Sequence, residues 1–156
     1  MQNKSINKII YRPMEDKDVD QVAEIEKHTF PTPWSRKSFY SEINENNIAH
    51  YIVAEKDNKI VGYGGLWHII TEMHITNIAV DKQYRGMGIG ESILSRLIEM
   101  AEIDELTEAM SLEVRRSNFA AQNLYRKHGF KVIGIREKYY EDNREDAFIM
   151  QKDIEK

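Results

Sequence analysis

The segment from Asn77 to Glu99 restricts the possible folds of this chain more than any other part of it. An apolar run typical of a β-strand (NIAV) is followed by a turn sequence (DKQY), a glycine-rich string (RGMGIG) and a helical pattern. The apolar positions of that pattern recur on one helical face: Ile89, Ile93, Leu94, Leu97, Ile98 and Ala101. A strand, a glycine loop and a helix start in this order predict a phosphate-binding structure, because a helix N-terminus has unpaired N–H groups and a partial positive charge.

The glycine-rich string does not by itself define one ligand. Gly86, Gly88 and Gly90 would let an anion approach the backbone closely, and Arg85 can add a charge-assisted hydrogen bond. The string does not fit a P-loop, because Glu and Ser follow Gly90 where that motif needs Lys and Ser or Thr. It does not fit the dinucleotide fingerprint either, since the glycines are spaced G-x-G-x-G rather than G-x-G-x-x-G. Taken alone, the string could equally be a tight turn whose glycines serve only the backbone.

The string from Asn77 to Gly90 nevertheless resembles the acyl-CoA-binding core of the GNAT superfamily of N-acetyltransferases. The motif of that core, Gln/Arg-x-x-Gly-x-Gly/Ala, fits in two registers, one starting at Gln83 and the other at Arg85. The resemblance implies that acetyl-CoA is the cosubstrate, that the loop amides hold its pyrophosphate, and that the preceding strand pairs with the pantetheine arm. It assigns cofactor binding to Ile78, Ala79, Val80, Arg85, Gly86, Met87, Gly88, Ile89, Gly90 and, later in the chain, Asn118.

A second stretch, SLEVRRSNFAAQNLYRKHGF, together with YYEDNREDAFIM near the C-terminus, resembles the RimI-type members of that superfamily. These enzymes acetylate the N-terminal alanine of the eighteenth small-subunit ribosomal protein, and the resemblance covers essentially the whole chain. It implies that a protein N-terminus is the partner, that Glu113 is the general base, and that Tyr125, on the next helix, is the general acid. The reaction requires both roles, because the attacking amine must lose a proton and the leaving thiolate gains one.

Several alternatives remain open for the functional residues. A glutamate on a strand is usually a solvated face residue, a tyrosine on a helix usually belongs to the core, and Asn118 could be only a helix N-cap. Tyr139 and Tyr140 could line a peptide entrance or pack on the sheet. The acids around them could steer a basic N-terminal tail or form a solvated loop. We expect the histidines outside these motifs to be structural or surface residues: His28, His68, His74 and His128.

Periodicity and turn residues divide the chain into alternating strands and helices. Strands are predicted at residues 8–12, 50–55, 60–68, 73–80, 109–115, 130–136 and 146–150, and helices at 16–30, 35–44, 117–128 and after the glycine loop. Ser35 is the expected N-cap of the second helix, with Trp34 and Phe39 forming a hydrophobic staple or shaping a substrate groove. Glycines at 62, 64 and 65 indicate a bulge or a close backbone approach. This order predicts an α/β fold of the GNAT type, with a mixed central sheet flanked by helices, in a single domain spanning residues 1–156.

Composition narrows the possible functions further. The net charge of −4 argues against a protein that binds nucleic acid directly through a broad basic face. The absence of cysteine excludes disulfides, cysteine nucleophiles and thiolate metal sites, and the five histidines show no metal-ligand spacing, so we expect no metal. No run is long enough to span a membrane and the N-terminus lacks an apolar signal core, so we expect a cytoplasmic protein without membrane binding.

Two other functions are compatible with the same sequence. One is a GNAT acetyltransferase that acts on lysine side chains or small amines, since the sequence does not show the shape of the acceptor pocket. The other is a CoA-binding module without turnover. The presence of both a carboxylate, Glu113, and a phenol, Tyr125, at the implied positions argues against the second.

Overall fold

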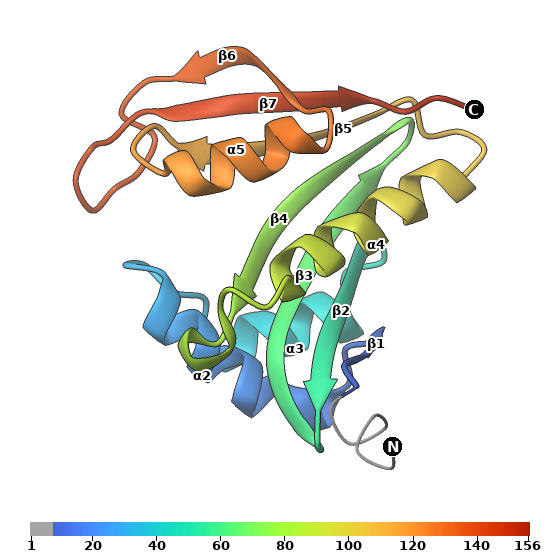
Figure 1. Cartoon of the computed structure of the whole chain (residues 1–156), viewed down its shortest axis with the longest axis vertical. Helices are drawn as coiled ribbons and strands as arrows, with labels where there is room; N and C mark the ends of the chain where they lie inside the picture. Colours follow the sequence, from blue (N-terminus) through green and yellow to red (C-terminus); the bar gives the residue numbers. More distant parts are fainter. Residues whose placement is uncertain (1–7) are drawn as a thin grey trace. The chain divides into compact units, whose positions relative to one another are not determined.

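The computed structural model describes residues 8–156, which form two compact units (Figure 1). The first unit contains the residues up to Trp67 together with Thr76–Leu97. The second contains His68–Ile75 and Ile98–Lys156. Two strands and one helix contribute residues to both units, and each unit is described by itself below.

Within residues 8–156, seven strands form one mixed sheet, which confirms the predicted fold class. They are β1 (Ile10–Pro13), β2 (Ala49–Lys56), β3 (Lys59–Ile69), β4 (Glu72–Val80), β5 (Ala109–Arg115), β6 (Lys131–Arg136) and β7 (Ala147–Asp153). The strand order is β1-β2-β3-β4-β5-β7-β6. Strands β4 and β5 pair in parallel, whereas β1–β2, β2–β3, β5–β7 and β6–β7 are antiparallel.

The helices lie close to the predicted ranges. They are α2 (Val19–Thr29), α3 (Arg36–Asn44), α4 (Ile89–Ile103) and α5 (Phe119–Lys127), with short 3₁₀ helices η1 (Asp16–Asp18) and η2 (Lys82–Tyr84). Strand β7 extends beyond the predicted end at residue 150, because Gln151, Lys152 and Asp153 pair with the start of β5. Their polar side chains gave no sign of this pairing in the sequence.

The first unit packs an aromatic and aliphatic core between α2, α3 and the adjoining strands. Val19 and Val22 of α2, Phe39 of α3 and Tyr63 of β3 are fully buried. The Ser35 hydroxyl accepts a hydrogen bond of 3.1 Å from the Ser38 backbone N–H, which confirms the predicted N-cap. The rings of Trp34 and Phe39 lie 5.4 Å apart, as the predicted staple requires.

The glycines of β3 serve close packing, as the sequence indicated. A Cβ added to Gly64 would lie 2.5 Å from a methyl carbon of Ile93 on α4, and one added to Gly65 would lie 2.0 Å from the ring of Tyr51. The predicted bulge is also present, as a register shift in the β2–β3 ladder at Ala54. The approaching groups at Gly64 and Gly65 are side chains rather than backbone, so these glycines position α4 and Tyr51.

The second unit presents one face of β5 to the core and leaves the other for polar residues. Leu112 and Val114 are buried, while the alternate residues of the strand are only partly buried, as the predicted alternation requires. The next helix, α5, is followed by Gly129, whose φ of +93° confirms the predicted left-handed residue. In residues 8–156, no helix combines the length and apolarity that crossing a membrane would need.

Candidate active site

Two glycines of the loop in the first unit adopt a backbone conformation that other residues rarely take. Gly86 and Gly88 have φ angles of 82° and 79°, which favour glycine, and a Cβ added at either position would meet nothing within 4 Å. Helix α4 begins directly afterwards at Ile89. The loop therefore has open space above a backbone that leads into a helix N-terminus, which is an arrangement that suits an anion.

Strand β4, which precedes this loop, pairs in parallel with β5 at Glu72–Ala109, Met73–Met110 and His74–Ser111. The stretch Ile78–Val80, to which the family resemblance assigns the pantetheine arm, forms the C-terminal end of β4. Its backbone pairing with the two amides of pantetheine stays a prediction.

The side chains of the predicted cofactor-binding residues differ in burial and in their hydrogen bonds. Arg85 donates a hydrogen bond of 3.0 Å from Nε to the Val80 carbonyl and so ties the loop to the end of β4. Ile89 and Ala79 are buried, whereas Met87 is exposed. Ile89 and Ala79 could thus meet a cofactor only through their backbone, and the anion contact expected of Arg85 stays a prediction.

In the second unit, Glu113 is held by two donors from different strands. Its Oε1 lies 3.0 Å from His74 Nε2 and its Oε2 lies 3.2 Å from Arg136 Nε. The Glu113 side chain is 13% exposed. The hydrogen bond from His74, helped by Arg136 and opposed by burial, holds the pKa of Glu113 below its ordinary value. Glu113 is therefore an anion at neutral pH.

His74 and Arg136 were missed by the sequence interpretation. His74 was expected to be a structural or surface residue, but it contacts the candidate base and its Nδ1 also lies 3.0 Å from the Ser111 hydroxyl. Parallel pairing of the two predicted strands places His74 opposite Ser111, two residues before Glu113 on the same face. A search for polar residues facing each other across those strands could have found this pair. No local pattern marked Arg136.

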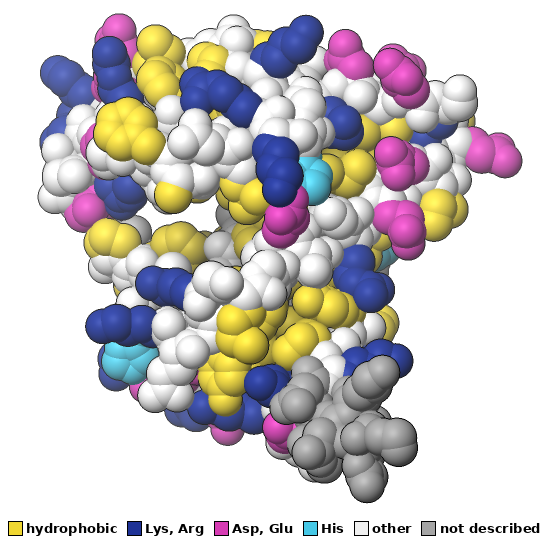
Figure 2. Space-filling view, in the orientation of Figure 1, with side chains coloured by type: hydrophobic (Ala, Val, Ile, Leu, Met, Phe, Trp, Pro, Cys, Tyr) yellow, Lys and Arg dark blue, Asp and Glu magenta, His cyan; other side chains and the backbone are white. Residues whose placement is uncertain are grey.

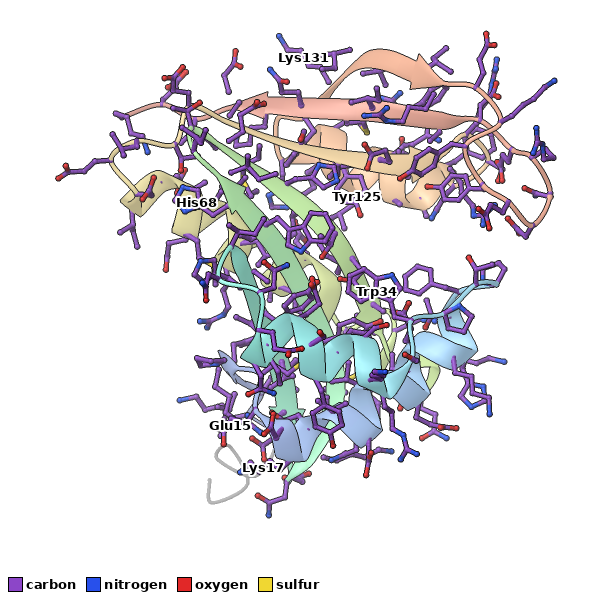
Figure 3. The ribbon with its side chains drawn as sticks, turned by 180° about the vertical axis from the view of Figure 1, so that it is seen from behind. Glu15, Lys17, Trp34, His68, Tyr125 and Lys131 are labelled. Atoms are coloured by element: carbon purple, nitrogen blue, oxygen red, sulfur yellow. The ribbon has the colours of Figure 1, made fainter. Side chains whose placement is uncertain are left out.

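Tyr125 projects from α5 (Figure 3). Its ring packs against that of Phe130, with 5.9 Å between the centroids. Burial of the ring raises the pKa of Tyr125 to about 12, so the phenol keeps its proton at neutral pH. A phenol that keeps its proton can donate it to another molecule.

Asn118 fills the N-cap role that the sequence left open. Its Oδ1 accepts a hydrogen bond of 3.1 Å from the Ala121 backbone N–H. Capping uses only the oxygen of the amide. The contact with CoA that the family resemblance implies is compatible with this geometry and stays a prediction.

The acidic loop between β6 and β7 is bound to the end of β5 instead of forming a free solvated run. Arg115 pairs with Asp142 at 2.9 Å and with Glu145 at 3.2 Å, and its guanidinium lies 3.8 Å from the Tyr140 ring centroid. The Tyr139 ring packs edge-on against Tyr140 at 5.1 Å and is 46% exposed. The packing alternative therefore applies to Tyr140, whereas Tyr139 remains accessible.

On the face shown in Figure 2, basic and acidic side chains are intermixed and do not gather into one basic patch. Within the part of the chain that the structure describes, no group of three His, Asp or Glu side chains is arranged to hold a metal ion.

Comparison with known proteins identifies the protein family to which this chain belongs. The model of the acetyltransferase (GNAT) family matches residues 19–130, and the chain belongs to this family. A candidate [ribosomal protein bS18]-alanine N-acetyltransferase of Bacillus subtilis (strain 168) is 46% identical over 92% of this chain and 94% of its own length. The [ribosomal protein bS18]-alanine N-acetyltransferase of Escherichia coli (strain K12) is 34% identical over 88% of this chain and 92% of its own.

Solved structures agree with this assignment. The ribosomal-protein-S18-alanine N-acetyltransferase from Escherichia coli superposes with a TM-score of 0.86, at 32% identity, over 96% of each chain. Arabidopsis thaliana NAA60 in complex with a bisubstrate analogue gives a TM-score of 0.87 at 16% identity, over 94% of this chain and 98% of that one, which shows the fold alone. The chain is thus an acetyltransferase with the GNAT fold and is similar to RimI-type enzymes.

Proposed function

We propose that this enzyme transfers an acetyl group from acetyl-CoA to a protein N-terminal α-amine, and that its substrate is the N-terminal alanine of ribosomal protein bS18. The similarity to two proteins with that assigned activity, over nearly the whole chain, supports the substrate. The observation that carries the chemistry is the ionised Glu113 carboxylate, held near the surface between His74 and Arg136. A ribosomal substrate implies a cytoplasmic site of action.

The residues of the first unit fit acetyl-CoA. The amides around Gly86 and Gly88 provide donors for the pyrophosphate without a side chain in the way. The edge of Ile78–Val80 provides backbone partners for the pantetheine arm, and one of its N–H groups can stabilise the oxyanion that forms on the thioester carbon. CoA would then bind in the mode of the family, on a loop of suitable conformation.

Glu113 receives the proton of the amine. An α-amine has a pKa of about 8, so roughly a tenth of it is neutral at pH 7. A carboxylate with a lowered pKa is too weak a base to deprotonate the bound ammonium. Once the neutral amine has bonded to the thioester carbon, however, its N–H becomes far more acidic and Glu113 can accept the proton directly or through water.

Tyr125 completes the transfer. The tetrahedral intermediate collapses by breaking its carbon–sulfur bond, and the thiolate of CoA takes the phenolic proton. Since burial raises the pKa of Tyr125 to about 12, the phenol is fully protonated when that step begins. The products are the acetylated N-terminus and free CoA.

The test is to incubate the enzyme with acetyl-CoA and a peptide that carries the bS18 N-terminus, and to follow free thiol and peptide mass. We expect one acetyl group on the α-amine. A control peptide with a blocked N-terminus and a free lysine should stay unmodified. Acetylation of lysine or of small amines in place of the α-amine would reject the substrate assignment. Tight CoA binding without thiol release would reject the proposed transfer activity.

A further inference from the structure

Arg136 occupies a position that the proposed reaction does not explain. It lies at the end of β6, and its guanidinium contacts Glu113 Oε2 at 3.2 Å while lying 6.0 Å from the Tyr139 ring centroid. Its side chain is 53% exposed, so it can exchange this contact for water. An exposed pair of this kind adds little to stability, which suggests that its use lies elsewhere.

The charges around Glu113 come from each element that packs against it. His74 faces it from β4, Arg136 faces it from β6, and Tyr139 and Tyr140 interact with it from the loop after β6. The residue opposite it on β7, Ile149, is apolar. Among these groups, Arg136 carries a permanent positive charge, and its contact offsets part of the −1 charge of Glu113.

The opposite charges of Glu113 and Arg136 affect the charge state in which an amine would bind. An amine that contacts Glu113 Oε2 lies within about 6 Å of Arg136 Nε, because each of the two contacts to that oxygen spans roughly 3 Å. A carboxylate without a cation would stabilise the ammonium form, which has no lone pair and cannot attack the thioester. A guanidinium at that distance opposes the ammonium and leaves the neutral amine unaffected.

We propose that Arg136 controls the charge state in which the acceptor amine binds: by offsetting Glu113 it disfavours the unreactive ammonium, so that the site takes up the neutral amine. This inference rests on the proposed function of Glu113. In this role, Arg136 selects the neutral form of the substrate amine. The role also explains why a general base that lies beside an arginine is compatible with amine acetylation. Loss of Arg136 would fill the site with ammonium, which lowers kcat and KM together and leaves kcat/KM nearly unchanged.

The experiment measures binding of the alanine peptide to the enzyme saturated with CoA, a complex that cannot react, from pH 6 to pH 9. For the wild type, the Kd should fall as the pH rises through the peptide pKa, because the neutral amine binds. Arg136→Gln should bind about tenfold more tightly at pH 7 and lose most of that pH dependence, as removal of a charge at this distance shifts the relevant pKa by about one unit. Arg136→Lys should restore the wild-type profile.

Arg116→Gln is the matched control. Arg116 is 61% exposed and pairs with Asp146 at 3.3 Å, so its removal takes away one exposed arginine without a contact to Glu113. It should leave the binding profile unchanged. A wild-type Kd that does not fall with rising pH, or an Arg136→Gln profile identical to wild type, would overturn the inference. Failure of the wild type to acetylate the peptide would instead reject the proposed function.

Discussion

Glu26 of the first unit and Glu113 of the second are both shielded from solvent, but their partners differ in kind. Glu26, on α2, is 3% exposed and accepts hydrogen bonds from the Trp34 backbone N–H at 3.0 Å, from the Asn77 amide at 3.4 Å and from the Tyr63 hydroxyl. These donors are neutral. Glu113 is held by an imidazole and a guanidinium instead.

The difference shows why burial alone does not identify a catalytic carboxylate. The donors of Glu26 belong to the core or to the backbone, and burial together with the charge of Glu26 raises the pKa of Tyr63 well above its ordinary range. A substrate could replace none of these donors without exposing the core. Arg136 is half exposed, so a substrate can share or replace its contact with Glu113. We infer that Glu26 stabilises the fold and Glu113 takes part in the chemistry.

The largest effect should follow from Glu113→Gln. The amide keeps the shape of the side chain but cannot accept the proton, so kcat should fall by roughly 10²–10⁴ while CoA still binds. Steady-state thiol release, with CoA affinity measured in parallel, checks this. Glu99→Gln, which changes an exposed carboxylate of α4, serves as the control and should keep the wild-type rate. Equal rates in both variants would remove Glu113 from the mechanism.

Tyr125→Phe should have the next largest effect. It removes the proton donor and keeps the ring packed on Phe130, so kcat should fall by about 10² or more with little change in stability. The measurement is the single-turnover rate, with thermal unfolding as the check on folding. An acyl donor whose leaving thiol is more acidic needs the phenol less and should recover part of the lost rate. A variant as fast as wild type would show that the thiolate leaves without this acid.

Glu26→Ala should act on stability instead. It leaves the Trp34 N–H and the Tyr63 hydroxyl in the core without an acceptor, at a cost of about 2–4 kcal/mol in the free energy of unfolding. Urea unfolding measures this cost. Glu26→Gln, which retains an acceptor oxygen, should lose less. If Glu26→Ala is as stable as wild type, the hydrogen bonds to Glu26 contribute nothing to the free energy of unfolding. The distinction between a structural Glu26 and a catalytic Glu113 would then fail.

A third carboxylate, Asp18, should have a smaller effect than Glu26 or Glu113, and this effect should depend on pH. Asp18 accepts two hydrogen bonds from Arg12, at 2.7 and 2.8 Å. Although burial opposes ionisation, these bonds and the Glu15 N–H lower the pKa of Asp18. Its contribution to stability is therefore present above the unfolded-state pKa of about 3.9 and is lost as the pH falls through the folded-state value.

Urea unfolding at several pH values between 7 and 3 tests that statement. Asp18→Asn should be less stable than wild type at pH 7, and the difference between the two proteins should shrink as the pH decreases. A difference that stays constant with pH would show that Asp18 contributes through packing and not through its charge.

Local features of the sequence predicted much of this molecule. The conformation of Gly86 and Gly88, the cap at Ser35 and the alternation along β5 each depend on residues close together in the chain, so a pattern could reveal them. The boundaries of most strands and helices were found for the same reason. The α/β class followed from the order of these elements.

The environment of Glu113 could not be predicted in the same way. His74 reaches it because β4 and β5 pair in parallel at Ser111, and Arg136 reaches it because β6 and β5 both pair with β7. Both contacts depend on strand register between distant segments. The ion pairs of Arg115 with Asp142 and Glu145 also join distant segments of the chain. They hold a loop whose acidic composition, taken alone, indicates a solvated segment.

The most direct test compares Glu113→Gln with Glu26→Gln in one experiment. Each folded protein is loaded with acetyl-CoA and mixed with the alanine peptide, and the rate of the first turnover is measured at pH 7.5. If the two carboxylates differ as described, the rate of the first turnover should fall by a factor of at least about 10² in Glu113→Gln and change by less than about fivefold in Glu26→Gln. An equal loss in both, or a larger loss for Glu26→Gln, would contradict this expectation.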